Sequence, residues 1–206
     1  MVLGYHFIFS AYGFWLPNDP RGSWSDTIRN FELLKFGPGT KVEATRSVAH
    51  SPHDRALRLK AKQSLRYPPV KITGIQARAI ARGFASAAEE GTYVFHALAI
   101  LPDHAHLVMS RHSKHIDVIA AHLKSRATRQ MVDEGLHPLA RFASKNGRMA
   151  SPWARNYWCP FIRTVEHMRQ AIGYVKRNPI KAGLRAQRWN SVVPFEENAR
   201  RSRGAS

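Results

Sequence analysis

The chain has 206 residues, of which 32 are lysine or arginine and 14 are aspartate or glutamate, giving a formal net charge of +18. This length suits one domain with a substantial core, or at most two small ones. The single cysteine, Cys159, excludes an internal disulfide, and no apolar run is long enough to cross a membrane. The charge, concentrated in residues 41–90 and 141–206, indicates a polyanionic partner, which is nucleic acid or an acidic membrane surface.

The N-terminal stretch from Val2 to Leu16 is apolar, but it has no basic leader and no small-residue cleavage site. We therefore interpret it as part of the fold, with a first strand from Gly4 to Tyr12. Because one cysteine suits a reducing compartment, we expect a cytoplasmic, nucleoid-associated protein with no membrane partner.

An insertion of about residues 13–70 follows the first strand. Its beginning, residues 14–26, is dense in turn-forming and aromatic residues, so we expect an ordered loop. Trp15 and Trp24 in this loop either stack on unpaired bases or form a small core of the loop itself. A basic helix is predicted from Ser51 to Arg66, and its thin apolar content favours a surface position facing phosphate.

A β-hairpin is predicted from Tyr93 to Ser110, with Pro102 and Asp103 supplying its turn. In the second arm His104 and His106 are two residues apart, so both imidazoles leave the same face of the strand. Two neutral imidazoles on one face form a rigid pair of ligands for a divalent metal ion. The pattern is equally compatible with two exposed or hydrogen-bonded histidines that hold no metal.

Helices are predicted before and after the hairpin, from Thr73 to Glu90 and from about Lys114 to Glu134. In the second of these helices apolar residues recur at steps of three and four, while its basic residues project elsewhere. Trp153 to Ile162 is predicted to be a short aromatic edge strand, because Pro160 is excluded from a central one. Three aromatic residues here can either contact unpaired bases or pack in the core: Trp153, Tyr157 and Trp158.

The last predicted helix begins near Thr164, a favoured N-cap. Its expected buried stripe contains Val165, Met168, Ile172 and Val175. Tyr174 lies off this stripe, on a polar face that also carries His167, Gln170 and Asn178. Packing is the usual role of a helical tyrosine and is the alternative here. Pro179 is expected to end the helix, which would leave Asn178 at its terminus.

These polar residues indicate phosphoryl-transfer chemistry. The phenol of Tyr174 is a poor nucleophile at neutral pH unless its target is held in line and the developing charge is stabilised. A divalent metal held by His104, His106 and the amide oxygen of Asn178 could polarise a scissile phosphate. Attack by Tyr174 would then leave a covalent phosphotyrosine and a free hydroxyl end.

Two motifs carry a family resemblance, DHAHLV at residues 103–108 and YVKRNPIKAGL at residues 174–184. In this order they resemble the single-tyrosine transposases of the histidine-hydrophobic-histidine (HUH) superfamily, in particular the REP-associated tyrosine transposases. The resemblance covers the first strand and about residues 70–190, so it assigns no DNA-contact role to residues 13–69.

The resemblance implies an α+β fold with a ferredoxin-like core, an antiparallel sheet and helices on one face. We expect residues 1–206 to form one domain, with a basic disordered tail at about residues 197–206. The implied activity is Mg²⁺- or Mn²⁺-dependent nicking, and possible rejoining, of single-stranded DNA beside palindromic hairpins through a 5′-phosphotyrosine intermediate. The implied metal ligands are His104, His106 and Asn178, and the implied nucleophile is Tyr174.

The basic residues that we predict to contact DNA are Arg55, Arg58, Lys62, Lys124, Arg126, Arg155, Lys176, Arg177 and Lys181.

Two other functions fit parts of the sequence. A non-catalytic protein that binds single-stranded DNA or RNA on the same fold would use the histidines and the tyrosine to stack bases. A basic structural protein that coats nucleic acid would explain the charge but not the two motifs. A covalent protein–DNA adduct would distinguish the enzyme from both of these alternatives. We expect the enzyme to be a monomer or a homodimer.

Overall fold

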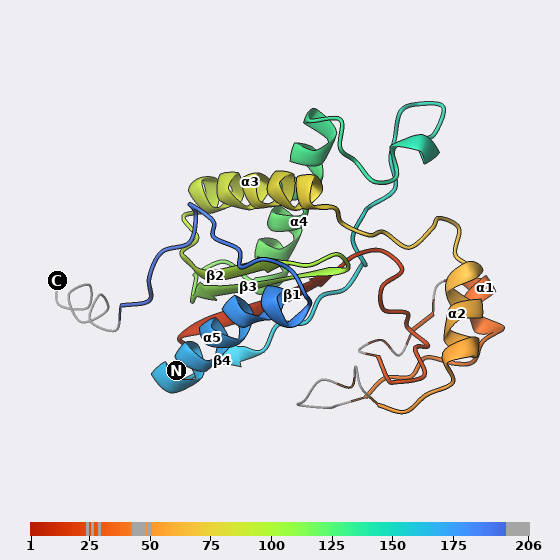
Figure 1. The fold of residues 1–206 in the computed structure, drawn as a ribbon, viewed down its shortest axis with the longest axis horizontal. Helices are drawn as coiled ribbons and strands as arrows, with labels where there is room; N and C mark the ends of the chain where they lie inside the picture. The colour runs from red at the N-terminus through yellow and green to blue at the C-terminus, as the bar shows by residue number, and fades with distance from the viewer. Residues whose placement is uncertain (24, 26, 29, 43–47, 49–50, 197–206) are drawn as a thin grey trace. The chain divides into compact units, whose positions relative to one another are not determined.

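A computed structural model describes residues 1–23, 25, 27–28, 30–42, 48 and 51–196 (Figure 1). The chain divides into two compact units. The first contains Met1–Phe9, Ile72–His137 and the chain from Tyr157 onward, and the second contains Ser10–Lys71 and Pro138–Asn156. The single domain with an insertion stays a prediction, and the predicted tail at about residues 197–206 lies outside the described residues.

The first unit contains a four-stranded sheet with the order β2-β3-β1-β4. Its strands are β1 (Gly4–Ser10), β2 (Phe95–Ile100), β3 (His104–Ser110) and β4 (Phe161–Ile162). The β2–β3 and β1–β4 pairs are antiparallel. The last helix before β2 is α3 (Gly74–Gly91) and the helix after β3 is α4 (Ile116–Asp133), and with this strand order they give the ferredoxin-like topology. The predicted α+β class and antiparallel ferredoxin-like core are therefore confirmed.

The hairpin of β2 and β3 is the best-predicted element. Its tip closes where the backbone N–H of Leu101 donates to the carbonyl of His104 at 2.8 Å. Beyond the tip the register pairs Ile100 with Ala105 and Ala99 with His106. All six residues of β2 are buried, so both faces of this hairpin need a cover.

Helices α3 (Gly74–Gly91) and α4 (Ile116–Asp133) cover one face of the sheet (Figure 1). Thr73 caps α3 in a capping box, as the start predicted at this residue requires. The two helices approach closely at Gly83, where an added Cβ would lie 2.6 Å from the Cα of Ala127. On the sheet side, the ring of Phe9 in β1 lies 5.8 Å from the ring of Phe84 in α3.

Helix α5 (Val165–Lys181) covers the opposite face (Figure 1). Its buried residues Met168 and Val175 form one hydrophobic cluster with Ala97 of β2 and Val108 of β3. The prediction of helices on one face is therefore wrong in this respect. The reason is that side chains alternate along a strand, so a hairpin that is apolar on both faces needs helices on both.

Two predicted boundaries are corrected by the structure. α5 continues through Pro179 and ends at Lys181, whereas we expected it to end before the proline. The strand predicted from Trp153 to Ile162 shrinks to β4, because its earlier part makes only isolated bridges, such as Ile8 with Trp158. Within the described residues, no helix combines the length and apolarity that a membrane span requires.

The second unit contains α1 (Phe31–Leu34), α2 (Arg55–Gln63) and a 3₁₀ turn, Ala140–Phe142. The predicted basic helix is therefore shorter than residues 51–66, and the side chain of Asp54 caps it. A small core joins the opening loop to both α-helices through Leu16, Leu33 and Ala61.

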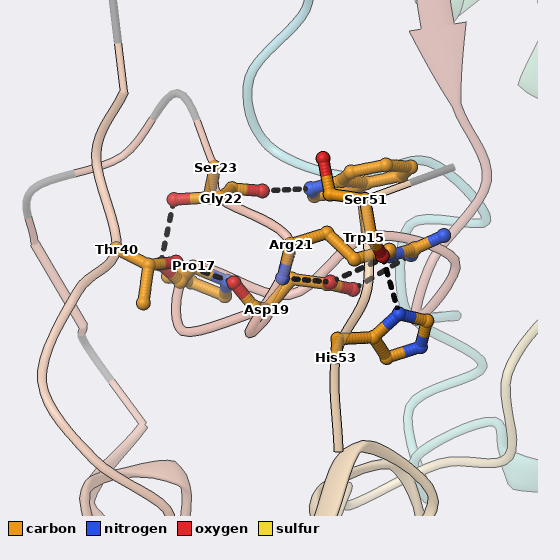
Figure 2. Close-up of polar contacts among 9 residues, drawn as sticks. All are labelled: Trp15, Pro17, Asp19, Arg21, Gly22, Ser23, Thr40, Ser51 and His53. Atoms are coloured by element: carbon orange, nitrogen blue, oxygen red, sulfur yellow. Dashed lines mark hydrogen bonds and ion pairs between the residues drawn. The ribbon is translucent and has the colours of Figure 1, made fainter. Parts of the chain in front are cut away.

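In its described part, residues 14–23, the opening loop of the second unit is organised around a buried ion pair (Figure 2). Asp19 is fully buried and accepts two hydrogen bonds of 2.8 Å from the guanidinium of Arg21. That guanidinium lies 3.8 Å from the ring centroid of Trp15, whose indole N–H donates to the carbonyl of Gly22. Trp15 therefore packs within the loop, and Trp24 lies outside the described residues.

Candidate active site

The two histidines of the hairpin face each other at the surface of the sheet that α5 covers. The Nε2 atoms of His104 and His106 lie 3.0 Å apart. Val108, two residues further along β3, belongs to the cluster that packs against α5, which fixes the face to which all three residues point. The predicted common face of the two imidazoles is therefore confirmed.

Asp103 orients the first of these histidines. Its Oδ1 atom lies 2.6 Å from Nδ1 of His104, at the tip of the hairpin. A carboxylate can only accept a hydrogen bond, so Nδ1 of His104 carries the proton and Nε2 keeps its lone pair. The turn residue thereby sets the tautomer in which His104 presents Nε2 toward His106.

A third histidine, His6 of β1, contacts His106 from the other side. Nε2 of His6 lies 3.0 Å from Nδ1 of His106, and the ring centroids are 5.1 Å apart. The contact arises because β1 is the neighbour of β3 in the sheet. Sequence reasoning missed His6, although a single histidine within an apolar strand is a signal that could have drawn attention to it.

Burial keeps two of these histidines uncharged. The pKa of His106 lies well below 6.5, mainly because the ring is buried and further because of the neighbouring His104 and His6. Burial also lowers the pKa of His6 to about 4, with a smaller contribution from His167. Neutral imidazoles keep one nitrogen lone pair each, which is the form that binds a metal ion.

Tyr174 of α5 lies beside these histidines. Its ring centroid is 5.5 Å from that of His106 and 6.1 Å from that of His6. The side chain is 41% exposed, so the ring is not part of the hydrophobic interior. The predicted position of Tyr174 off the buried stripe is confirmed, and the ammonium of Lys181 lies 5.9 Å from the ring centroid.

Asn178 follows Tyr174 by one helical turn on α5 and is half-buried. Its Nδ2 atom is buried and has no hydrogen-bond partner in the structure. The oxygen and nitrogen of an amide are assigned from hydrogen bonds, so the same position can hold the amide oxygen. A side chain that binds a cation would have an amide without a protein partner, as Asn178 does here.

The donor atoms fit a divalent cation in spacing. Two ligands at right angles, each about 2.1 Å from the ion, lie roughly 3.0 Å apart, which matches the two Nε2 atoms. Imidazole nitrogen is a softer donor than the oxygen ligands that Mg²⁺ prefers, and the choice between Mg²⁺ and Mn²⁺ stays a prediction. Among the described residues, no group of three or more His, Cys, Asp or Glu side chains is arranged to hold a metal. The role of Asn178 as a third ligand stays a prediction.

The predicted DNA contacts in the first unit fall into two groups. Lys176, Arg177 and Lys181 are exposed on α5, the helix of Tyr174. The ammonium of Lys124 instead lies 5.8 Å from the ring centroid of Phe9, and burial lowers its pKa to about 8.

Arg126 likewise has a protein partner, because its guanidinium lies 2.8 Å from a carboxylate oxygen of Glu90. The phenol of Tyr157 donates to Asp117 at 2.5 Å, and its ring packs against Phe7. DNA contact by Lys124 and Arg126 stays a prediction, with packing and ion pairing as competing roles.

The other predicted DNA contacts lie in the second unit. Arg55 and Arg155 are exposed, whereas Arg58 and Lys62 are half-buried. The ammonium of Lys62 lies 5.6 Å from the ring centroid of Phe14. Their roles also stay predictions, and Trp153 is only 3% exposed, which leaves it a packing role.

No family model matches the chain. A predicted REP-associated tyrosine transposase from Haemophilus influenzae is 33% identical over 92 residues, which cover 42% of this chain and 49% of that protein. The chain therefore matches about half the length of this relative.

Two solved structures are also similar to this chain. A REP-associated tyrosine transposase bound to a REP hairpin has 12% identity and a TM-score of 0.45, with 88% of this chain and 68% of that chain covered. A predicted transposase from Deinococcus radiodurans has 16% identity and a TM-score of 0.43, with 90% of this chain and 94% of that chain covered.

The family that the two sequence motifs indicated is the family of the Haemophilus influenzae relative. This chain is therefore similar in sequence, over 92 residues, to a protein named as a REP-associated tyrosine transposase.

Proposed function

We propose that the chain is a metal-dependent single-stranded DNA endonuclease and transposase, which nicks DNA next to palindromic hairpins with Tyr174 as nucleophile. The observation that carries the proposal is the placement of Tyr174. Its half-exposed ring lies 5.5 Å from the ring of His106, whose Nε2 atom faces that of His104. The proposed nucleophile and two candidate cation ligands thus lie beside one another, although about seventy residues separate them in sequence.

The reaction exchanges one phosphate ester for another. The phenolic oxygen of Tyr174 gives up its proton and attacks the scissile phosphorus, and the bond from phosphorus to the 3′ oxygen breaks as the new bond forms. The leaving oxygen takes up a proton, which gives a free 3′ hydroxyl and a 5′-phosphotyrosine. Because the ester bond is conserved in the adduct, the reverse reaction can rejoin strands.

The residues present fit a divalent cation, for which we propose His104, His106 and Asn178 as ligands. When bound, Mn²⁺ or Mg²⁺ would polarise the scissile phosphate and stabilise the charge that develops on it. The protein's own contribution is to hold two imidazoles with their Nε2 atoms 3.0 Å apart and the phenol next to them. Preorganised groups of this kind lower the barrier because they need no rearrangement during the reaction.

Exposed basic side chains on α5 would hold the DNA. Lys176, Arg177 and Lys181 follow Tyr174 on the same helix and are exposed, and phosphate contacts of this kind position a strand without reading its sequence. Arg55 and Arg155 of the second unit are further candidates. The Haemophilus influenzae relative supports hairpins of palindromic repeats as the substrate, and such a substrate would place the protein at the nucleoid.

The second candidate function is non-catalytic binding of single-stranded nucleic acid. The observation that favours it is that both ring nitrogens of His106 already lie at hydrogen-bond distance from another histidine. In that case the three histidines form a satisfied structural cluster, and Tyr174 stacks on a base.

The test is a covalent adduct on a denaturing gel after incubation with hairpin oligonucleotides and Mn²⁺. We expect a slower band that survives denaturation, that is absent from Tyr174→Phe, and that is strongly reduced in His106→Ala. Binding without any adduct across a broad set of hairpins would establish the non-catalytic function instead.

A further inference from the structure

We propose that His6 is a positioning residue for His106. It accepts a hydrogen bond from Nδ1–H of His106 and so holds this ring in the tautomer whose Nε2 lone pair is free for a cation. The inference rests on the proposed function, because it assigns a role within the cation site formed by His104 and His106. Neither of the two sequence motifs contains His6.

His6 contacts the Nδ1 atom of His106 and not its Nε2 atom. Its Nε2 atom lies 3.0 Å from Nδ1 of His106, whereas Nε2 of His106 faces His104 at the same distance. Since Nδ1 and Nε2 lie on opposite sides of an imidazole ring, His6 cannot share a cation with His104 through this nitrogen. His6 therefore acts on the ligand rather than on the cation.

Whether His106 can bind a cation through Nε2 depends on which of its ring nitrogens carries the proton, and few neighbouring groups can determine this. A neutral imidazole carries one proton, and only the nitrogen without that proton can bind a metal. The ring is 3% exposed, so water contributes little to this choice. An acceptor at Nδ1 stabilises the Nδ1–H form, which exposes the lone pair of Nε2.

The two candidate ligands are supported in matching ways. Asp103 accepts from Nδ1 of His104 at 2.6 Å, and His6 lies at the corresponding nitrogen of His106. The first support comes from the adjacent residue in the hairpin turn. The second comes from a neighbouring strand, one hundred residues earlier in the chain. Each Nε2 atom is thereby directed toward the space between the two rings.

The first experiment measures cation affinity in a protein that cannot react. Mn²⁺ is titrated into Tyr174→Phe protein, and free Mn²⁺ is followed by electron paramagnetic resonance. In this background, we expect His6→Leu to weaken binding about 10- to 100-fold, the usual effect of removing a partner of a metal ligand. His6→Gln keeps an amide that can accept near the position of Nε2, so it should recover most of the affinity.

The matched control is His96→Leu in the same background. His96 is also a buried histidine of this sheet, and its Nε2 atom lies 2.8 Å from the hydroxyl of Ser110. Loss of this ring tests the general effect of removing a buried histidine, and we expect Mn²⁺ affinity to stay within about threefold of the parent.

The second measurement needs no variant at His6, so it holds even if His6→Leu does not fold. In ¹⁵N-labelled Tyr174→Phe protein saturated with Mg²⁺, the ring nitrogens of His106 should show a proton on Nδ1 and none on Nε2. A proton on Nε2 in this state would overturn the inference.

The outcomes separate the two proposals. If the parent does not bind Mn²⁺, or if His106→Ala binds it equally well, the cation site itself is wrong and the proposed function loses its metal. If the parent binds through His106 and folded His6→Leu binds as tightly as the parent, the site stands and the role of His6 is refuted.

Discussion

The ring of Tyr174 meets the ring of His106 edge to face, with centroids 5.5 Å apart and ring planes at 84°. One residue comes from the exposed side of a helix and the other from a buried strand. Their contact brings the candidate nucleophile to the candidate cation ligands while 41% of the tyrosine remains accessible. The position of the phenol is thus compatible with access by a DNA strand.

Tyr174→Phe should abolish adduct formation and preserve DNA binding. The substitution removes the attacking oxygen but keeps the ring that contacts His106 and His6. We expect adduct formation to fall at least about 1,000-fold, because the oxygen proposed to form the phosphotyrosine bond is gone. Fluorescence anisotropy with a hairpin oligonucleotide should give a dissociation constant within about threefold of the wild type. An equally strong adduct in the variant would identify another nucleophile.

Asp103→Asn should weaken the cation site without unfolding the protein. The carboxylate accepts a hydrogen bond from Nδ1 of His104, whereas an amide can present either an acceptor or a donor there. We expect the Mn²⁺ concentration for half-maximal adduct formation to rise about tenfold or more. Thermal unfolding should change little, because the Asp103 side chain is 40% exposed. An unchanged Mn²⁺ requirement would show that Asp103 does not orient His104.

Stability should fall as the pH drops from about 6.5 toward 4. His6 has a folded pKa of about 4 against an ordinary value of 6.5, so the unfolded chain binds a proton more readily in this range. Uptake of protons on unfolding makes stability rise with pH there, and the contribution is complete above about pH 6.5. His106 acts in the same direction, because its pKa is also lowered.

Urea unfolding at a series of pH values measures this slope. For His6 alone a shift of about 2.5 units corresponds to roughly 3 kcal/mol at most across the range. His6→Gln removes one titrating group and should flatten the curve between pH 4.5 and 6.5. A curve as steep as that of the wild type would mean that His6 is not held neutral by burial.

Gly83→Ala should destabilise the packing of α3 on α4. The added Cβ would meet the Cα of Ala127 at 2.6 Å, and this atom belongs to helix backbone that cannot move aside locally. Overpacking of this kind costs about 1–3 kcal/mol of unfolding free energy. Gly74→Ala in the same helix is the matched control, since its Cβ would meet nothing within 4 Å. Equal stabilities of the two variants would contradict the close approach of the helices.

Lys176→Ala and Lys124→Ala should separate an exposed charge from a half-buried one. Each removes one positive charge, but Lys176 is exposed on α5 whereas the ammonium of Lys124 lies near the rings of Phe9 and Tyr157. The salt dependence of hairpin binding should lose about one ion contact in Lys176→Ala and none in Lys124→Ala. A reduced salt dependence in the second variant would restore the predicted DNA contact of Lys124.

Local periodicity in the sequence determines much of the candidate site. A step of two residues places His104 and His106 on one face of a strand, and the spacing of apolar residues on the last helix places Tyr174 outside its buried stripe. The turn at Pro102 and Asp103 determines the hairpin. These features depend on neighbours in the chain, which is why the sequence alone is sufficient for them.

Only the tertiary structure decided which distant residues complete the site. His6 reaches His106 because β1 lies beside β3, and no local pattern encodes strand order. The cover of both sheet faces and the position of Lys124 beside Phe9 likewise depend on how helices pack on the sheet. α5 passes through Pro179, which lies buried in its last turn, although the local preference of the residue before a proline favours an end there. In each case the outcome depends on packing between residues that are distant in sequence. Local preferences of neighbouring residues either do not specify that packing or are outweighed by it.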